Sequence, residues 1–190
     1  MILVVDNYDS FTYNIVQYVM ENNIQVDIVK NNQVNFEELD CKKYTHIIIS
    51  PGPGNPNNTG LCYDLIDRYY KDIPILGICL GHQLIGHYFK CKIVVHEEIF
   101  HGKVSNIINN RNDTALYKDI PDTFQATRYH SLVIDRSSIG DELIITSELS
   151  DSTIMGLKHR KYPLFGMQYH PESIGTKFGK KIIRNFILNV

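Results

Sequence analysis

The sequence lacks several features that mark whole classes of protein. Its 190 residues include no C-x-x-C pair, no basic leader and no long apolar run. The apolar stretch at the N-terminus ends after a few residues, so it is too short for a secretion signal or a membrane span. The cysteines lie singly along the chain, so we expect neither a disulfide framework nor a zinc knuckle; they are Cys41, Cys62, Cys79 and Cys91. These absences predict a soluble, cytoplasmic protein.

The sequence also lacks a strong charge and a complete metal-binding motif. The formal net charge is -2, which argues against nucleic acid as the main ligand. A local basic cluster is interpreted as a solvated helix face; it comprises Lys177, Lys180, Lys181 and Arg184. The segment His96 to Phe100 ends on phenylalanine where a zincin helix needs its second histidine, and His82 and His87 are five residues apart, off one helical face. We predict no metal site.

Length and composition predict one domain that spans residues 1–190. The chain is 43% hydrophobic, which is enough for a core of its own. Three short apolar runs are unbroken rather than alternating, as expected for strands buried on both faces of a parallel sheet: Ile2 to Val5, Ile47 to Ile49 and Ile75 to Ile78. Helical patterns lie between them. The order predicts an α/β fold with a doubly wound, mostly parallel sheet and helices on both faces.

Helical spacing marks the segments between these runs and the C-terminus. Asp9 and Ser10 are candidate caps of the first helix, and Asn58 and Thr59 of the second. The apolar positions are Phe11, Ile15, Val16, Val19 and Met20, then Leu61, Leu65, Ile66 and Tyr69, and finally Phe178, Ile182, Ile183, Phe186 and Ile187. Residues 92–155 are short segments rich in Ile, Val and Thr, which predict additional antiparallel strands.

The strongest local pattern is the segment Pro74 to Gln83, in which an apolar run leads into Cys79. Gly77 and Gly81 lie two residues away on either side, and such small neighbours allow the sharp strand-to-helix turn of a nucleophile elbow. The positive end of the following helix favours a reactive thiolate, and the backbone N–H of Leu80 is free to bind an oxyanion. Cys79 is therefore predicted to be a nucleophile, against the alternative of a buried core cysteine.

A second pattern follows another apolar strand that begins at Leu164. His170 and Glu172 are two residues apart, so in an extended backbone they point to the same side. Pro171 fixes one torsion between them. Glu172 can then accept a hydrogen bond from one imidazole nitrogen while the other nitrogen faces a thiol. A lone His-Pro-Glu is a weak signal, but together with Cys79 it predicts a Cys-His-Glu triad.

The third pattern is the loop Ser50 to Pro56, which follows the run at Ile47 to Ile49. Its glycines allow a substrate to approach the backbone closely. The loop is not a nucleotide-binding fingerprint, because that pattern needs glycine at the position of Asn57 and no Walker lysine follows. The alternative is a plain turn.

With these elements in this order, the sequence resembles the class I, triad-type glutamine amidotransferases over essentially its whole length. The family's three signatures match Pro51 to Gly54, Gly77 to Gln83 and His170 to Ser173. The resemblance implies a flavodoxin-like α/β fold. Further segments resemble the branch that serves chorismate-using enzymes, namely component II of anthranilate synthase and of aminodeoxychorismate synthase; they are Val5 to Asn14, His101 to Lys103 and Arg128 to Leu132.

The resemblance implies a role for each matching residue. Cys79 is expected to be the nucleophile, His170 the acid and base, and Glu172 its orienting partner. Gly52 and Leu80 are the implied oxyanion-hole donors. The residues implied to hold the substrate glutamine are Gly52, Pro53, Gly54, Leu80, Gln83, Ser131 and Leu132. The expected reaction hydrolyses glutamine to glutamate and ammonia.

The resemblance also implies partners. It implies no cofactor in this chain, whereas the synthase subunit of the family uses Mg²⁺. The expected partner is a chorismate-binding synthase subunit, component I, and we expect neither nucleic acid nor a membrane. The tryptophan and folate branches share these motifs, so the partner is anthranilate synthase, which we favour, aminodeoxychorismate synthase, or both. An independent cysteine hydrolase of the same fold and a non-catalytic binding module are the other hypotheses.

Overall fold

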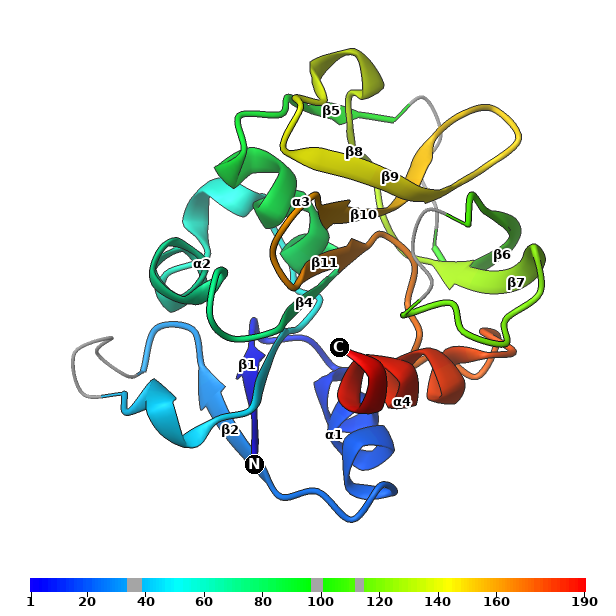
Figure 1. The fold of residues 1–190 in the computed structure, drawn as a ribbon. Coiled ribbons are helices and arrows are strands. Elements are labelled where there is room, and N and C mark those ends of the chain that lie inside the picture. Colours follow the sequence, from blue (N-terminus) through cyan, green and yellow to red (C-terminus); the bar gives the residue numbers. More distant parts are fainter. Residues whose placement is uncertain (34–38, 97–100, 112–114) are drawn as a thin grey trace.

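The computed structural model describes residues 1–33, 39–96, 101–111 and 115–190. Within these residues nine strands form one sheet in the order β2-β1-β3-β4-β11-β10-β9-β6-β7 (Figure 1). The first five strands run parallel and the other four are antiparallel. The strands are β1 (Ile2–Asp6), β2 (Val26–Lys30), β3 (His46–Ile49), β4 (Ile75–Ile78), β6 (Lys103–Asn109), β7 (Thr123–Arg128), β9 (Leu143–Glu148), β10 (Ile154–His159) and β11 (Leu164–Met167). The predicted α/β fold is confirmed.

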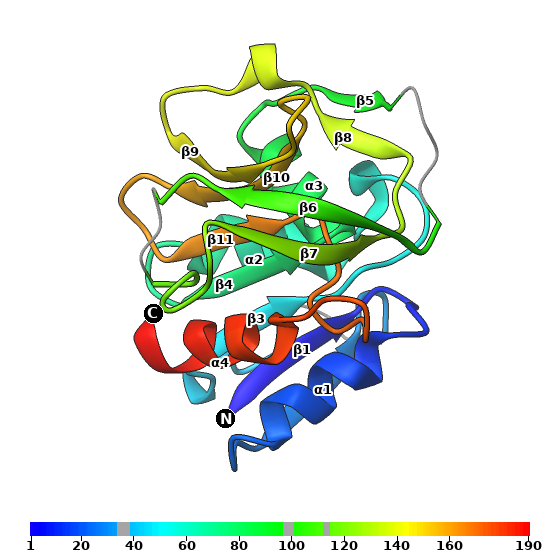
Figure 2. The ribbon, with the colours of Figure 1, turned by 90° about the vertical axis from the view of Figure 1, so that its right-hand side faces the viewer.

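Helices cover both faces of the parallel half of the sheet. Figure 2 shows two of them, α1 (Thr12–Met20) and α4 (Gly179–Asn189), on one face. The other face carries α2 (Leu61–Tyr69) and α3 (Leu80–Tyr88). In β1, Val4 packs into the core under α1 and α4, whereas its neighbour Val5 packs into the core under α2 and α3. Because successive strand residues point to opposite faces, two covered faces require an unbroken apolar run. None of the described helices has the length and apolarity that a membrane crossing needs.

One strand and two helix starts differ from the expectation. The pattern of apolar runs misses β2, because this edge strand is only partly buried and carries Asp27 between its apolar residues. The predicted caps are wrong: α1 begins after Phe11 and α2 after Gly60, and neither has a side-chain capping hydrogen bond. Asp9 instead accepts the backbone N–H of Phe11 at 2.8 Å, and Thr59 donates to the Pro56 carbonyl at 3.3 Å. Both side chains stabilise the loops before the helices.

The described part of residues 92–155 contains antiparallel strands, as predicted. Four of these strands extend the main sheet beyond β11, and β5 (Ile93–Val95) pairs with β8 (Leu132–Ile134) in a separate two-stranded sheet. An isolated bridge joins Thr127 of β7 to His170, which follows β11. The antiparallel half therefore braces the loop that carries the predicted base.

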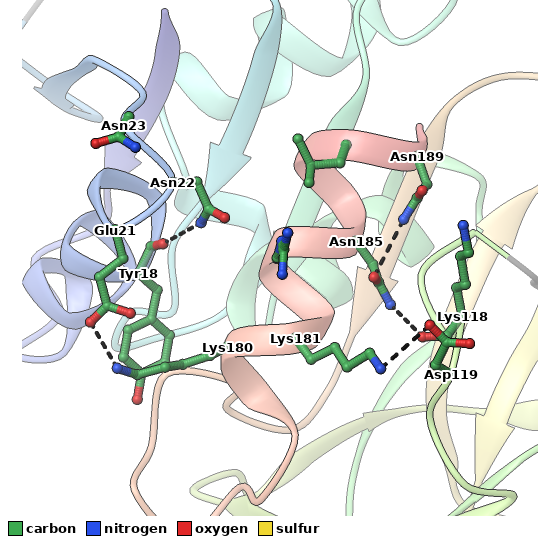
Figure 3. A pocket seen from close by; sticks show the side chains of 12 residues that line it. Tyr18, Glu21, Asn22, Asn23, Lys118, Asp119, Lys180, Lys181, Asn185 and Asn189 are labelled. Atoms are coloured by element: carbon green, nitrogen blue, oxygen red, sulfur yellow. Dashed lines mark hydrogen bonds and ion pairs between the residues drawn. The ribbon is translucent and has the colours of Figure 1, made fainter.

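The C-terminal helix α4 docks through its predicted apolar face, since Ile182, Ile183 and Phe186 are fully buried. Its polar side borders a groove of about 850 Å³ at the end of α1 (Figure 3). Two residues of the basic cluster form ion pairs at this groove: Lys180 lies 2.7 Å from Glu21, and Lys181 lies 3.4 Å from Asp119. Among the described residues, neither a cysteine nor a histidine lines the groove.

Candidate active site

The three sequence patterns meet at one edge of the sheet. The strands β3, β4 and β11 are parallel neighbours, and their carboxyl ends lead directly to Ser50, Cys79 and Gln168. Met167 lies in register with Ile78, and its carbonyl accepts the N–H of Cys79 at 2.8 Å. Ligands of such folds bind outside the carboxyl ends of the strands. The topology thus brings the predicted nucleophile and the predicted base to adjacent loops.

Cys79 occupies a strained turn between β4 and α3. Its backbone has φ 51° and ψ -96°, a combination that side-chain-bearing residues rarely adopt. A Cβ on Gly77 would lie 2.4 Å from the backbone of Gly81, and a Cβ on Gly81 would lie 2.7 Å from the Ile49 carbonyl oxygen. Only glycine fits at these two positions. The elbow that the paired glycines predict is present.

His170 and Glu172 form a buried hydrogen-bonded pair. Nδ1 of His170 lies 2.6 Å from Oε1 of Glu172, and the two side chains are 3% and 0% exposed. The His170 backbone is held at both ends: its N–H donates to the Thr127 carbonyl at 3.0 Å, and its carbonyl accepts from Oγ1 of Thr176 at 2.6 Å. Nδ1 is therefore engaged by the carboxylate, and Nε2 remains for Cys79.

The surroundings of the imidazole favour its protonated form. Burial alone lowers the pKa of His170, but interaction with Cys79 and with Glu172 outweighs burial and raises the pKa to about 10. Nε2 makes no hydrogen bond of standard geometry within the described residues, so we attribute the influence of Cys79 to a close but imperfectly aligned contact. A protonated ring beside the sulfur stabilises a thiolate.

The loop after β3 is held against the elbow by the segment after β1. The backbone N–H of Asn7 donates to Oγ of Ser50, and its side-chain amide donates to the Ser50 carbonyl, both at 2.9 Å. A Cβ on Gly52 would lie 2.5 Å from Cβ of Asn7 and 3.0 Å from the Leu80 side chain. Gly52 and Leu80 are thus neighbours, and Leu80, as the first residue of α3, has no acceptor for its N–H within the helix. Their role as oxyanion donors stays a prediction.

The residues implied to hold glutamine are placed unequally. The Gln83 amide nitrogen donates to the Leu132 carbonyl at 3.0 Å, so these two residues are in contact. Ser131 is exposed just before β8, and Pro53 and Gly54 are exposed in the loop after β3. Because Gln83 uses its amide nitrogen within the protein, its amide oxygen is the atom left to face a substrate. The substrate contacts of all these residues stay predictions.

Sequence reasoning missed Gln168, Tyr129 and Phe11. The Gln168 amide nitrogen lies 3.5 Å from the Cys79 sulfur. The Tyr129 ring meets the His170 ring edge-on at 5.0 Å, and Phe11 lies 5.5 Å from Tyr129. A signal for Gln168 exists, because it is two residues before His170 and extended backbone points both to one side. The aromatic contacts join distant segments and leave no local pattern.

The remaining cysteines are poorly suited to act as nucleophiles. These three cysteines and Cys79 are all free thiols. Burial raises the pKa of Cys62 to about 12 and also raises the pKa values of Cys41 and Cys91. A raised pKa leaves less of the reactive thiolate at neutral pH. Cys79 differs from these three because a protonated imidazole lies beside it.

Residues 1–33, 39–96, 101–111 and 115–190 contain no group of three or more metal-ligating side chains that could hold an ion. Most of the segment His96 to Phe100 lies outside these ranges, since residues 97–100 are not described. His82 is wholly buried, and burial lowers its pKa to about 3, so it stays neutral at ordinary pH.

Sequence comparison places relatives over nearly the whole chain. The model of the family "Glutamine amidotransferase class-I" matches residues 3–190. The bifunctional protein TrpGD of Thermotoga maritima is 45% identical over 98% of this chain, which spans only 32% of that protein. Anthranilate synthase component 2 of Cyanophora paradoxa is 46% identical and covers 98% of both chains. The same component of Saccharolobus solfataricus is 44% identical over 99% of this chain and 98% of its own.

Solved structures share the fold. A protein from Thermoplasma acidophilum described as a GMP synthase subunit has a TM-score of 0.86 and 25% identity, over 98% of this chain and 91% of that one. A glutamine amidotransferase from Thermotoga maritima has a TM-score of 0.75 at 15% identity, over 90% and 75% of the two chains, and shows the fold alone. The family model, the relatives and the recognised motifs agree: this chain belongs to the class-I glutamine amidotransferase family.

Proposed function

We propose that this chain is the glutaminase subunit of anthranilate synthase. It hydrolyses the side-chain amide of glutamine and supplies the ammonia to a chorismate-binding synthase subunit. The observation that carries the proposal is the meeting of Cys79, His170 and Glu172 at the ends of β4 and β11. The choice of synthase is supported by relatives called anthranilate synthase component 2, which are 41–46% identical over 91–98% of their own length.

In the first half of the reaction the Cys79 thiolate attacks the amide carbon of glutamine. The carbonyl electrons move to oxygen, and the backbone N–H groups of Gly52 and Leu80 stabilise this oxyanion. Protonated His170 then gives its Nε2 proton to the leaving nitrogen. The C–N bond breaks, ammonia leaves and a γ-glutamyl thioester remains on Cys79.

In the second half His170 acts as a base, and the causes of its raised pKa explain the change of role. Cys79 holds the pKa up while its sulfur interacts with the ring, and that contribution ends when the sulfur is acylated. The pKa then falls, which keeps the ring neutral after it has given its proton to ammonia, and the neutral ring takes a proton from water while the water oxygen attacks the thioester carbon. The C–S bond breaks, glutamate leaves, and the thiolate and the protonated ring are restored. Glu172 orients the ring in both halves.

Exposed apolar side chains at the carboxyl edge of the sheet support the proposed partner. Ile174, two residues past Glu172, is fully exposed, while Tyr13 at the start of α1 is 67% exposed and Val104 is 50% exposed. A Cβ on Gly175 would lie 3.3 Å from Val104, which places Val104 beside Ile174. Neighbouring exposed apolar side chains, here Val104 and Ile174, favour an interaction site. We assign this edge to the synthase, because free ammonia is largely protonated in neutral water and reacts only if it reaches its acceptor directly.

The test compares two nitrogen sources in the complex of this chain with an anthranilate synthase component I. Cys79→Ala should abolish anthranilate formation from glutamine and leave formation from added ammonium salt intact, because ammonia bypasses the glutaminase. Anthranilate fluorescence measures both rates. Equal loss from both sources would contradict the proposal.

The same assay separates the other hypotheses. If only an aminodeoxychorismate synthase component I stimulated the glutaminase activity, the partner would be that synthase and the chain would belong to the folate branch. Full glutaminase activity of the isolated chain, unchanged by either synthase, would favour an independent hydrolase.

A further inference from the structure

A row of buried polar side chains leads away from the Cys79 sulfur. Gln168 begins it, with Nε2 3.5 Å from the sulfur. Gln83 follows, with its own Nε2 3.2 Å from Oε1 of Gln168. The two glutamines are 0% and 3% exposed. They lie on the elements that carry the triad, because Gln83 is one turn along α3 from Cys79 and Gln168 immediately follows β11.

The orientation of each amide follows from the acceptor at the far end of the row. The Leu132 carbonyl can only accept hydrogen bonds, so the Gln83 atom 3.0 Å from it must be the NH₂ group. The same NH₂ group donates to Gln168, which identifies the Gln168 atom it meets as the oxygen. The other end of the Gln168 amide is then NH₂ and points at Cys79. A flipped Gln168 would place two NH₂ groups against each other and an oxygen lone pair against the sulfur.

The Leu132 carbonyl is itself held by a histidine of defined tautomer. Nε of Arg128 donates to Nε2 of His130 at 3.0 Å, so Nε2 must be the unprotonated nitrogen. Nδ1 of His130 then carries the proton and donates to the Leu132 carbonyl at 3.1 Å. Burial and, after it, the Arg128 charge lower the pKa of His130 to about 3, which keeps this neutral form at physiological pH.

We propose that Gln168 is a further residue in contact with the reacting sulfur and that Gln83 and His130 are positioning residues that aim its N–H at Cys79. The residues His130, Gln83 and Gln168, linked through the Leu132 carbonyl, are called the relay below. The inference rests on the proposed function, which gives the relay a thiolate to stabilise. A hydrogen bond to a charged acceptor is stronger than one between neutral groups, and an amide donor does not titrate. The relay also explains the arrangement of Arg128 and His130, which take no part in the chemistry of the triad but hold the Leu132 carbonyl.

The titratable groups near Cys79 that the structure describes can be named one by one, so the contribution of the relay can be isolated. His170, backed by Glu172, is the titratable group that faces the sulfur from the loop after β11. On α3, buried His82 stays neutral with a pKa of about 3. The loop of residues 50–54 after β3 has no ionisable side chain. Substituting a glutamine of the relay therefore changes a hydrogen bond and no charge.

The test is the pH dependence of Cys79 alkylation by iodoacetamide in the full chain, followed at the Cys79 peptide by mass spectrometry. The thiolate is the form that reacts, and this reagent needs no glutamine pocket. Gln168→Met keeps the side-chain length and removes the donor, so the midpoint should rise by about one pH unit, which is a roughly tenfold smaller thiolate fraction below the midpoint. Gln83→Met should shift it in the same direction, because the Gln168 amide is then no longer held.

Two further comparisons separate positioning from a loss of structure. His130→Leu should also raise the midpoint, whereas His130→Asn should restore it, since the asparagine NH₂ can take the place of Nδ1. The matched control is Asn185→Leu. Asn185 is 6% exposed on α4, and its NH₂ group donates to the carbonyls of Leu116 and Lys118, away from the site. This variant should lose stability and keep the wild-type midpoint.

An unchanged midpoint in folded Gln168→Met and Gln83→Met overturns the inference. An equal rise in Asn185→Leu also overturns it, because any loosening of the fold would then produce the shift. The proposed function fails by a different result, namely a wild-type complex with its synthase that releases no ammonia from glutamine. The alkylation midpoints are measured without glutamine, so the two failures are distinguishable.

Discussion

At the scale of single residues, the candidate site depends on coupling between neighbours rather than on one unusual side chain. Burial disfavours the charged imidazole of His170, and Cys79 and Glu172 together reverse that preference. Removing either neighbour therefore changes the protonation state of the ring as well as deleting its own function. Effects of substitutions within this group should not add.

Glu172→Gln should move the alkaline limit of glutaminase activity to lower pH by about one unit or more. His170 must be protonated when ammonia departs, and a pKa raised to about 10 keeps it protonated through the neutral range. Glutamine at position 172 removes the negative charge that supports this pKa, so the ring loses its proton at lower pH. The measurement is the pH profile of ammonia release with the synthase present.

The control for this variant is Glu148→Gln. Glu148 is a carboxylate of β9 that pairs with Arg136, not with His170. Its substitution should leave the alkaline limit where it is. An unshifted limit in Glu172→Gln would show that this carboxylate does not set the protonation of His170.

The residues with a local pattern could be predicted from the sequence. Cys79 is marked by its flanking glycines, and His170 and Glu172 are marked by a spacing of two. Each pattern can therefore be recognised without knowledge of the fold. The hydrogen bond between Gln83 and Gln168 joins positions 85 residues apart. This hydrogen bond exists because β4 and β11 are neighbours in the sheet. That adjacency cannot be predicted from a short segment of the sequence.

At the scale of elements, the sheet order and two glycines place Cys79. Strands buried on both faces could be predicted, because two covered faces leave no polar position in the run, as in Ile47 to Ile49. The strand β2 could not be predicted, because this edge strand is only partly buried and its Asp27 is held by Tyr44 and Lys43. The helix caps could not be predicted either, since the side chains of Asp9 and Thr59 form hydrogen bonds within the loops before the helices.

Gly77→Ala and Gly81→Ala should each lower the free energy of unfolding by about 1–3 kcal/mol, the usual cost of overpacking. The added Cβ would lie 2.4 Å from backbone atoms in the first variant and 2.7 Å in the second. Glutaminase activity should fall as well, because relief of the clash displaces the elbow. Urea denaturation measures the stability change.

Gly140→Ala is the matched control, because a Cβ there meets nothing within 4 Å. It should change the free energy of unfolding by less than about 0.5 kcal/mol. Wild-type stability in both elbow variants would contradict the close packing of β4 against α3.

At the scale of the whole molecule, the two ends of the sheet differ in character. The carboxyl edge carries the candidate site and the exposed apolar residues Tyr13, Val104 and Ile174. α4 runs back from that edge and ends near where β1 begins, as Figure 2 shows. The groove beside α4 is lined mainly by charged and amide side chains, together with Tyr18 and Leu188, and it contains the ion pairs of Lys180 and Lys181. We place the synthase at the carboxyl edge because the candidate site lies there and ammonia has to reach its acceptor directly.

Ile174→Glu should weaken binding of the synthase by about tenfold or more, because it places a charge in an apolar contact. The isolated chain should keep its stability and its basal glutaminase activity, since the side chain is fully exposed. Titration of anthranilate formation against synthase concentration measures the affinity. Leu188→Glu, at an exposed position near the end of α4, should leave that affinity unchanged. Equal weakening by both variants would contradict the proposed surface.

The central claim is that Cys79 is the thiol that attacks glutamine, and the most direct measurement is covalent labelling with a glutamine-like diazoketone followed by peptide mapping. We predict that the label appears on the peptide containing Cys79, that excess glutamine slows its appearance and that Cys79→Ala prevents it. Burial raises the pKa values of Cys41, Cys62 and Cys91, so these thiols should stay unlabelled. Predominant labelling of any of these three, or labelling that persists in Cys79→Ala, would contradict the claim.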